Sequence, residues 1–358
     1  MKKKIAIIGS KGLPANYGGF ETLTNYISLY QGKNYDITVF CDKTNKKSNV
    51  KTFNGVNLKY LPLDANGIQS IPYDIIAIIL SWFKYDSLLI LGTPGVIIIP
   101  FLKIFKKTNT IINFGGLEWK RDKWNFLGKW FLKKSEAIAI KHATHIVADN
   151  QYFVNYIKSE YNKETKLIEY GGDHVKELQA TNEIIKEYPF LNKEYFLSVS
   201  RAQYDNNLHL LLEAFSKMQD KTLVLISNWN NFEYGKDLKL KYKDFSNIYM
   251  VDAIYDLSIL DVIRTNCTAY IHSHTYCGTA PSLVEAMNLS LPIISFKNDT
   301  NPFTTENKAI FFSDVNELIK VISELNKDDL IKMKSEIKKI ADSRYTWDRI
   351  GKLYAELF

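Results

Sequence analysis

Short apolar segments alternate with amphipathic segments along almost the whole chain, and this alternation constrains the fold more than any other feature. In the first half the apolar segments are residues 5–9, 36–41, 87–91, 110–114, 145–148 and 166–168. In the second half they are residues 195–200, 222–227, 248–251, 269–272 and 292–296. Strands that are separated by helices form parallel sheets built from strand–helix–strand units. The two series therefore predict an α/β protein with two doubly wound, Rossmann-like domains.

The length of the chain agrees with two domains, because 358 residues exceed one ordinary hydrophobic core. We predict domains at residues 1–175 and 190–342, joined by a polar, acidic stretch. The final segment, residues 343–358, carries apolar residues at helical spacing: Trp347, Ile350, Leu353, Tyr354 and Leu357. We expect it to form a helix that returns toward the first domain, although an ordinary core helix would show the same stripe.

The composition is that of a soluble globular protein, with 46% hydrophobic and 24% charged residues. The three cysteines, Cys41, Cys267 and Cys277, lack metal-ligand spacing, and an odd number argues against a disulfide framework. The longest apolar stretches, residues 75–83 and 96–105, are much shorter than the roughly 20 residues that span a membrane. We therefore expect a cytoplasmic protein.

The net charge of +7 is concentrated in residues 1–175, whereas the remainder is slightly acidic. A basic half could face nucleic acid, anionic lipid or a phosphorylated substrate, or could simply be a solvated lysine-rich surface. Nucleic acid is the weakest of these, because the basic residues are spread widely and form no recognised module.

A glycine-rich loop follows the first apolar segment, with the sequence GSKGLPANYGGFET at residues 9–22. Its glycines would let the backbone approach a ligand closely, and a helix starting near Gly19 would direct its N–H groups at an anion. The spacing differs from the GxGxxG of nicotinamide-dependent enzymes. An anion site and a plain turn both remain open for this loop.

A second loop, residues 200–207, leaves the first strand of the predicted second domain. Ligands of open α/β sheets bind at the carboxyl ends of the strands, which is where Arg201 would lie. An arginine can form two charge-assisted hydrogen bonds to a diphosphate.

A third segment, HSHTYCGTAPSLVEAM at residues 272–287, leads from a strand through small residues into a helix. Thr279 or Ala280 would cap that helix, and Pro281 suits its first turn. The backbone N–H groups around Gly278 suit a phosphate, and Glu285 could accept hydrogen bonds from a ribose.

Metal binding is not expected. His272 and His274 would need a third ligand, and we identify none beside them. The chain also lacks an Asp-x-Asp motif that could hold a metal-bound nucleoside diphosphate. The basic loops and helix N-termini must then neutralise the diphosphate.

With these segments in place, the sequence resembles the family 4 retaining glycosyltransferases, which have the GT-B fold. Within them it resembles the rhamnosyltransferase-like branch of bacterial capsule and O-antigen synthesis. Further matching motifs are GLEWKRDKW at 116–124, IVADNQ at 146–151, YGGD at 170–173 and YTW at 345–347.

The resemblance implies a role for each motif, with the active site in the cleft between the two domains. Arg201 and Gly19 would serve catalysis. The donor would contact Gly18, Gly19, Arg201, Asn206, Ser227, Asn228, His274, Gly278, Thr279, Ala280 and Glu285. The acceptor would be bordered by Glu118, Lys120 and Arg121.

The same resemblance implies a retaining, metal-independent hexosyltransferase that needs no cofactor. Its donor would be a nucleotide sugar, with dTDP-rhamnose the best candidate, and its acceptor a saccharide linked to polyprenyl diphosphate at the inner membrane face. The segment 124–134 interleaves aromatic and basic residues as an interfacial helix does, or as a core helix with a lysine-rich outer face does.

Four positions depart from the pattern of these families. Asn206 stands where most family 4 enzymes carry lysine, a feature the rhamnosyltransferase-like branch shares, and Cys277 stands where the wider family has glutamate. The branch itself usually has aspartate at Gly115 and asparagine at Ala280. The departures at Cys277, Gly115 and Ala280 keep open the alternative of a non-catalytic nucleotide-sugar-binding subunit. A GT-B-fold UDP-sugar 2-epimerase is a second alternative, although the carboxylate-rich pattern that it would require is missing.

Overall fold

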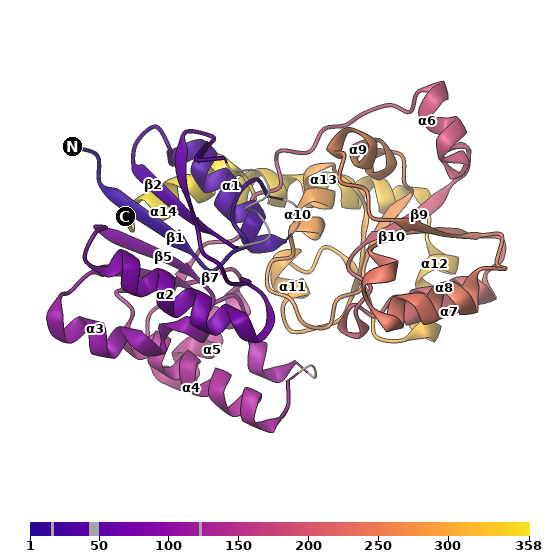
Figure 1. Ribbon diagram of the computed structural model, residues 1–358. Coiled ribbons are helices and arrows are strands. Elements are labelled where there is room, and N and C mark those ends of the chain that lie inside the picture. The colour runs from indigo at the N-terminus through magenta and orange to yellow at the C-terminus, as the bar shows by residue number, and fades with distance from the viewer. Residues whose placement is uncertain (16–17, 43–49, 122–123) are drawn as a thin grey trace. The chain divides into compact units, whose positions relative to one another are not determined.

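The computed structural model describes residues 1–15, 18–42, 50–121 and 124–358. The chain divides into two compact units: in Figure 1 the first is coloured indigo to magenta with a yellow C-terminal segment, and the second is coloured pink through orange to yellow. The first unit holds Met1–Tyr170 together with Trp347–Phe358, and the second holds Gly171–Thr346.

The first unit is built on a sheet of eight strands among the described residues, in the order β3-β4-β2-β1-β5-β6-β7-β8. The pairs are parallel except for the antiparallel pair β3–β4. The strands are β1 (Lys4–Ile8), β2 (Asp36–Cys41), β3 (Thr52–Phe53), β4 (Val56–Tyr60), β5 (Ser87–Leu91), β6 (Asn109–Asn113), β7 (His145–Ala148) and β8 (Lys166–Leu167).

Helices cover both faces of this sheet, which is why its central strands are apolar on both sides. Ala6 and Ile8 of β1 belong to the hydrophobic core shared with α2, α3, α4 and α5, and the intervening Ile7 is equally buried on the other face. In Figure 1 these four helices lie on one side of the strands, and α1 and α14 lie on the other. The helices are α1 (Gly19–Gln31), α2 (Ser70–Trp82), α3 (Ile99–Phe105), α4 (Phe126–His142), α5 (Gln151–Tyr161) and α14 (Trp347–Ala355), with short 3-10 helices η2 (Gly67–Gln69), η3 (Pro94–Ile98) and η4 (Glu118–Lys120).

The second unit has a fully parallel sheet of six described strands in the order β11-β10-β9-β12-β13-β14. Numbered from its own first strand, this is the order 3-2-1-4-5-6 of a dinucleotide-binding fold. The strands are β9 (Tyr195–Val199), β10 (Thr222–Ser227), β11 (Ile248–Asp252), β12 (Ala269–His272), β13 (Ile293–Phe296) and β14 (Ile310–Phe312).

Helices flank this second sheet as well. One hydrophobic core joins residues of α7, α8 and α12 to the strands, including Leu211, Leu238 and Leu318. The helices are α6 (Asn182–Glu187), α7 (Leu208–Lys217), α8 (Glu233–Tyr242), α9 (Leu257–Thr265), α10 (Pro281–Asn288), α11 (Asn301–Thr304), α12 (Val315–Glu324) and α13 (Lys327–Arg344), with η5 (Pro189–Asn192), η6 (Tyr204–Asn206) and η7 (Trp229–Asn231).

The α/β class and the two parallel sheets predicted from the alternation are confirmed. Three strands at or next to the edge of a sheet were not predicted: β3, β4 and β14. They lie at the margins of their sheets, where a strand buries fewer residues and the apolar signal is weak; β4, for example, has one buried residue, Val56.

The join between the units differs from its predicted position. Residues 171–189 belong to the second unit. The reason is local hydrogen bonding: the backbone N–H of Lys176 donates to Asp261 at 3.0 Å, and the amide of Asn266 donates to the carbonyl of Leu178 at 3.3 Å.

The C-terminal segment is divided between two helices, because α13 continues to Arg344 and α14 begins at Trp347. The apolar stripe of α14 packs in the first unit. Trp347 stacks on Tyr26 of α1 with ring centroids 4.3 Å apart, and the Tyr354 hydroxyl accepts a hydrogen bond from Asn113 at 2.8 Å.

None of the described helices is both long enough and apolar enough to cross a lipid bilayer.

Candidate functional site

The strand order of the second sheet marks where a ligand can bind. The order reverses between β9 and β12, which lie side by side, so the connections leaving these two strands run in opposite directions. Ligands of open α/β sheets bind in the crevice that this reversal creates at the carboxyl ends of the strands. The two connections are residues 200–207 and 273–280, which are the second and third segments singled out in the sequence.

These two loops are joined to each other by hydrogen bonds. The side-chain amide of Asn207 donates to the Ser273 carbonyl at 2.9 Å and to the Thr275 hydroxyl at 2.7 Å. The Ser273 hydroxyl donates to the carbonyl of Asn206 at 2.5 Å, and the Thr275 N–H donates to the carbonyl of Asp205 at 2.9 Å. The loops therefore form one preorganised surface.

Arg201 lies on this surface with its side chain exposed. Its backbone is fixed, because its carbonyl accepts hydrogen bonds from the Gln203 N–H and the Asn206 side chain, both at 2.8 Å. Asn206, predicted to contact the donor, is 4% exposed and uses its amide to hold Arg201. The structure thus gives Asn206 a supporting role, which the sequence did not reveal.

Ser227 and Asn228 follow the neighbouring strand β10. The side-chain oxygen of Asn228 accepts the Ala202 N–H at 2.9 Å, so this residue also supports the arginine loop. The Ser227 and Ser200 hydroxyls are buried, and neither has a hydrogen-bond partner among the described residues. Such unsatisfied buried groups are uncommon in native proteins, so a ligand at these strand ends would find hydroxyls available to it.

The helix α10 begins as the sequence predicts, with Ala280 as its N-cap and Pro281 at its first position. Its cap has no side-chain hydrogen bond, so the cap provides no competing oxygen for the first N–H groups. Together with the small residues Gly278 and Thr279 before it, this helix start suits an anionic ligand.

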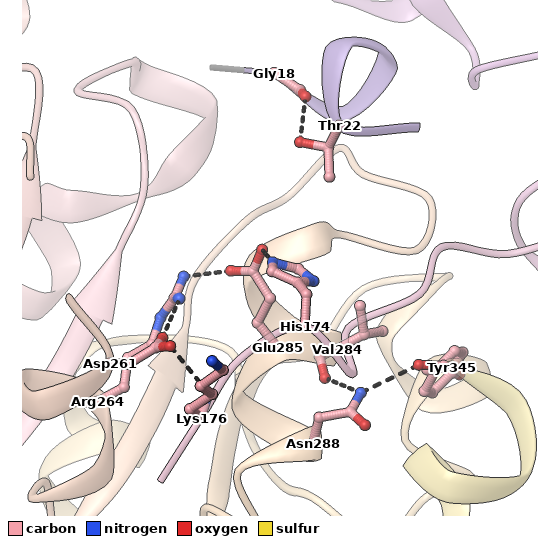
Figure 2. A network of polar contacts seen from close by, with 10 residues as sticks. All are labelled: Gly18, Thr22, His174, Lys176, Asp261, Arg264, Val284, Glu285, Asn288 and Tyr345. Atoms are coloured by element: carbon pink, nitrogen blue, oxygen red, sulfur yellow. Dashed lines mark hydrogen bonds and ion pairs between the residues drawn. The ribbon is translucent and has the colours of Figure 1, made fainter. Parts of the chain in front are cut away.

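Glu285 of α10 lies in a buried network of charges (Figure 2). One carboxylate oxygen is paired with the guanidinium of Arg264, and the other lies 3.3 Å from the imidazole of His174. Arg264 also pairs with Asp261 at 3.3 Å. Burial, the largest single influence, would raise the pKa of Glu285, but Arg264 and His174 together outweigh it and hold that pKa below its ordinary value.

The sequence identified Glu285 as a ribose-binding residue but did not identify its partners Arg264, Asp261 and His174. An ionised carboxylate has about four lone-pair positions, so a ribose could still bind beside the existing contacts. The pairing nevertheless gives Glu285 a structural role that the sequence did not predict. The sequence feature that could have indicated this pairing is Arg264 in the largely apolar helix α9, because a buried guanidinium needs a partner of opposite charge.

From the sequence we identified no third metal ligand beside His272 and His274, but the structure places one there. Cys277 lies in the same loop, and the ligand atoms of the three side chains all lie within 4.8 Å of one another. The sequence spacing alone did not bring Cys277 to these histidines, because the loop must turn back to do so.

In the first unit, the loop after β1 turns on glycines with positive φ angles: Gly9, Gly12 and Gly18. Gly18 caps α1, which begins at Gly19 as predicted, and its carbonyl accepts hydrogen bonds from the N–H and hydroxyl of Thr22. The carboxylate of Glu21 accepts the Lys11 N–H at 2.8 Å and so ties the loop to the helix. Residues 16 and 17 of this motif lie outside the described residues.

The segment predicted to border the acceptor forms η4. Glu118 contacts Arg121 at 3.3 Å and accepts a hydrogen bond from the indole of Trp124 at 3.3 Å. Lys120 is exposed, with its ammonium 5.7 Å from the ring of Trp119. Two of the three predicted acceptor residues therefore bond to each other, and Lys120 is directed to the surface.

A cluster around Glu136 of α4 anchors this segment, and the sequence did not reveal it. The buried Glu136 carboxylate accepts hydrogen bonds from the Trp119 indole at 2.8 Å and from the hydroxyls of Tyr156 and Tyr161 at 2.7 and 2.6 Å. The Lys133 ammonium also donates to it, at 2.8 Å, and lies 4.7 Å from the Trp119 ring. The sequence feature that could have indicated this cluster is Glu136 itself, the one acidic residue among the lysines of α4.

Gly115, where the resembling branch carries aspartate, has a structural reason to be glycine. Its φ is +67°, and a Cβ there would lie 2.8 Å from the ring of Phe20. An aspartate would require this ring to move.

Two family models match the two halves of the sequence. Residues 180–344 match the family model described as glycosyl transferases group 1, and residues 2–173 match a domain of unknown function. None of the curated proteins matches the sequence.

Solved structures resemble the whole chain. Sucrose-phosphate synthase from Thermosynechococcus elongatus superposes with a TM-score of 0.83 at 13% identity, over 99% of this chain and 98% of that one. Anabaena HepE in complex with UDP and glucose gives 0.76 at 15% identity, over 99% and 98%. A glycosyltransferase from Rickettsia africae gives 0.76 at 14%, over 99% and 97%. The chain therefore has the GT-B fold, and residues 180–344 of its second unit match the glycosyl transferases group 1 model.

Proposed function

We propose that this chain is a retaining glycosyltransferase whose second unit binds a nucleoside diphosphate sugar. One observation carries the proposal: at the strand-order reversal the loop that carries Arg201 is joined by hydrogen bonds to the loop that leads into α10, in a region that matches glycosyl transferases group 1. An exposed guanidinium and a helix N-terminus together suit a diphosphate. The buried Ser200 and Ser227 hydroxyls add hydrogen-bonding capacity at the same strand ends.

The proposed reaction is a front-face substitution. The bond between the anomeric carbon and the diphosphate oxygen breaks, a bond from the acceptor oxygen forms on the same face, and the acceptor proton passes to the departing diphosphate. Such chemistry needs stabilisation of the leaving group and close positioning of the acceptor rather than a protein base. Arg201 and the α10 N-terminus would supply that stabilisation, so we propose that transfer requires no metal.

For the donor, dTDP-rhamnose is our first candidate, on the strength of the family resemblance. UDP sugars are the second, because Anabaena HepE has been solved in complex with UDP-glucose. We retain Gly18, Gly19, His274 and Glu285 as proposed donor contacts.

For the acceptor, we propose a saccharide on polyprenyl diphosphate, reached at the inner face of the membrane and bordered by the Glu118–Arg121 segment. The exposed start of α4 supports contact with a lipid surface. Phe126, Leu127 and Trp130 are 82%, 71% and 57% exposed, and lysines are interspersed along the same helix. Aromatic and basic residues on one helix suit the interface of an anionic membrane. The product would serve surface polysaccharide synthesis.

A screen of nucleotide sugars tests the donor half of the proposal. A donor at 100 times its dissociation constant should add about 2.7 kcal/mol to stability, which a thermal-unfolding assay detects. The stabilising donor is then incubated with lipid-linked acceptors while nucleoside diphosphate release is measured, and the anomeric configuration of the product is determined by NMR.

Arg201→Ala should lower turnover by roughly 10²–10³, the scale for removing one preorganised charge contact. Lys236→Ala, on an exposed side chain of α8 in the same unit, is the matched control and should leave turnover unchanged. Near-normal turnover in Arg201→Ala would overturn the diphosphate assignment. An inverted product would overturn retention, and epimerisation of the donor without acceptor would favour an epimerase.

A further inference from the structure

His272, His274 and Cys277 form a compact group of potential metal ligands in the second unit. The His272 and His274 rings lie with their centroids 4.3 Å apart, and the Cys277 sulfur lies 3.7 Å from Nε2 of His272. All three ligand atoms fall within 4.8 Å of one another. Among the residues that the structure describes, this is the one group of three histidine, cysteine or carboxylate side chains with such spacing.

We propose that these three side chains bind a borderline-soft divalent metal, with zinc as the foremost candidate. Two imidazole nitrogens and one thiolate are a donor set that suits zinc. With zinc–sulfur and zinc–nitrogen bonds of about 2.3 and 2.0 Å, a tetrahedral ion separates sulfur from nitrogen by about 3.5 Å and the two nitrogens by about 3.3 Å. The 3.7 Å between the Cys277 sulfur and Nε2 of His272 is close to the sulfur–nitrogen value, and the three ligand atoms all lie within 4.8 Å of one another.

The backbone around the group is held in place. His272 ends β12 and is 1% exposed, and the next residue, Ser273, is bonded to the neighbouring loop through Asn206 and Asn207. Cys277 lies 3.5 Å from the side-chain oxygen of Asn301. Three protein ligands leave a fourth position for water or another oxygen ligand, as in zinc sites that stay open.

The metal and the donor should weaken each other's binding. This step rests on the proposed function, in which His274 and the loop following Cys277 contact the donor. A metal bound to His274 withdraws that side chain from the donor and fixes the loop in the metal-bound arrangement. Coupling between two ligands is reciprocal, so the donor must weaken metal binding by the same factor.

Cobalt(II) titration of the donor-free protein tests the site without any use of activity. The expected result is one cobalt per chain, with a thiolate-to-metal charge-transfer band and the intense visible bands of tetrahedral cobalt, all displaced by zinc. Cys277→Ser should abolish the charge-transfer band, and His274→Asn should weaken binding at least about 100-fold, since even outer contacts are worth 10–100-fold. Cys267→Ser, on a cysteine outside the group, is the control and should retain both bands.

Absence of the bands in a protein with wild-type thermal unfolding would overturn the site, as would bands that persist in Cys277→Ser. Neither result affects the proposed binding of a nucleotide-sugar donor, which the nucleotide-sugar screen tests separately. Repeating that screen with zinc present tests the coupling: a lower donor affinity supports it, and an unchanged affinity of a zinc-loaded protein refutes it.

Discussion

Replacing Arg264 with methionine should destabilise the second unit more than replacing its partner Glu285 with glutamine. The side chains of Arg264, Asp261 and Glu285 are only 3%, 5% and 11% exposed. Removing the arginine leaves two buried carboxylates without their shared cation, and breaking a buried pair from one side costs about 3–5 kcal/mol. In Glu285→Gln the arginine keeps Asp261, so the cost is nearer the 1.5–3 kcal/mol of one hydrogen bond to a charged group.

Urea unfolding, monitored by hydrogen exchange of peptides from Gly171–Thr346, measures the stability of the second unit alone. Lys320→Met, an exposed substitution on α12, is the control and should change the unfolding free energy by less than about 0.5 kcal/mol. A loss in Arg264→Met that is equal to or smaller than the loss in Glu285→Gln would refute the reasoning, because it would mean that the arginine does not neutralise both carboxylates.

The same pair makes a prediction about pH. Because the pKa of folded Glu285 is lowered from 4.5, its ionised form contributes stability that is fully present above that pH. This contribution is lost as the pH falls through the lowered, folded-state value. The stability difference between the wild type and Glu285→Gln should therefore shrink in that range, and a difference that stays constant below pH 4.5 would contradict the assigned ion pair.

Three further predictions concern the first unit. Glu136→Gln should raise KM for the acceptor more than KM for the donor, because Trp119 loses the carboxylate that positions it; comparable rises in both, measured by steady-state kinetics, would refute this. Gly115→Asp should destabilise the protein by about 1–2 kcal/mol through its left-handed backbone, and Phe20→Leu should reduce that loss in thermal unfolding by removing the colliding ring. Trp130→Ser should weaken co-sedimentation with anionic vesicles at low salt by about tenfold or more, if its side chain enters the lipid surface; unchanged binding would exclude α4 from membrane contact.

The central strands and the start of α10 could be predicted because each rests on a strong local signal. Both faces of β9 are covered, so its five residues are all buried and read as one apolar run. Pro281 fixes the first turn of α10, and small residues precede it. The position of Arg201 at the carboxyl end of β9 could be predicted for the same reason, since it lies two residues after that strand.

The partners of these residues could not be predicted, because they depend on distant contacts. Arg264 meets Glu285 across 21 positions of sequence, and Glu136 meets Tyr161 across 25. Sequence spacing does not show which side chains a parallel sheet brings together when helices of variable length separate the strands. For the same reason Asn206 and Asn228 were assigned to the ligand, although their amides support the backbone near Arg201.

The two units hold their loops by different physical means, and this difference bears on how each tolerates change. In the second unit, neutral asparagine, serine and threonine side chains join the loops that carry Arg201 and Thr275. Each such bond contributes only about 0.5–1.5 kcal/mol, so single changes should shift the loops with little loss of stability. In the first unit, one buried carboxylate, Glu136, holds Trp119 together with a lysine and two tyrosines. Because one carboxylate joins all of these side chains, we expect the segment around Trp119 to shift as a whole when that charge is removed.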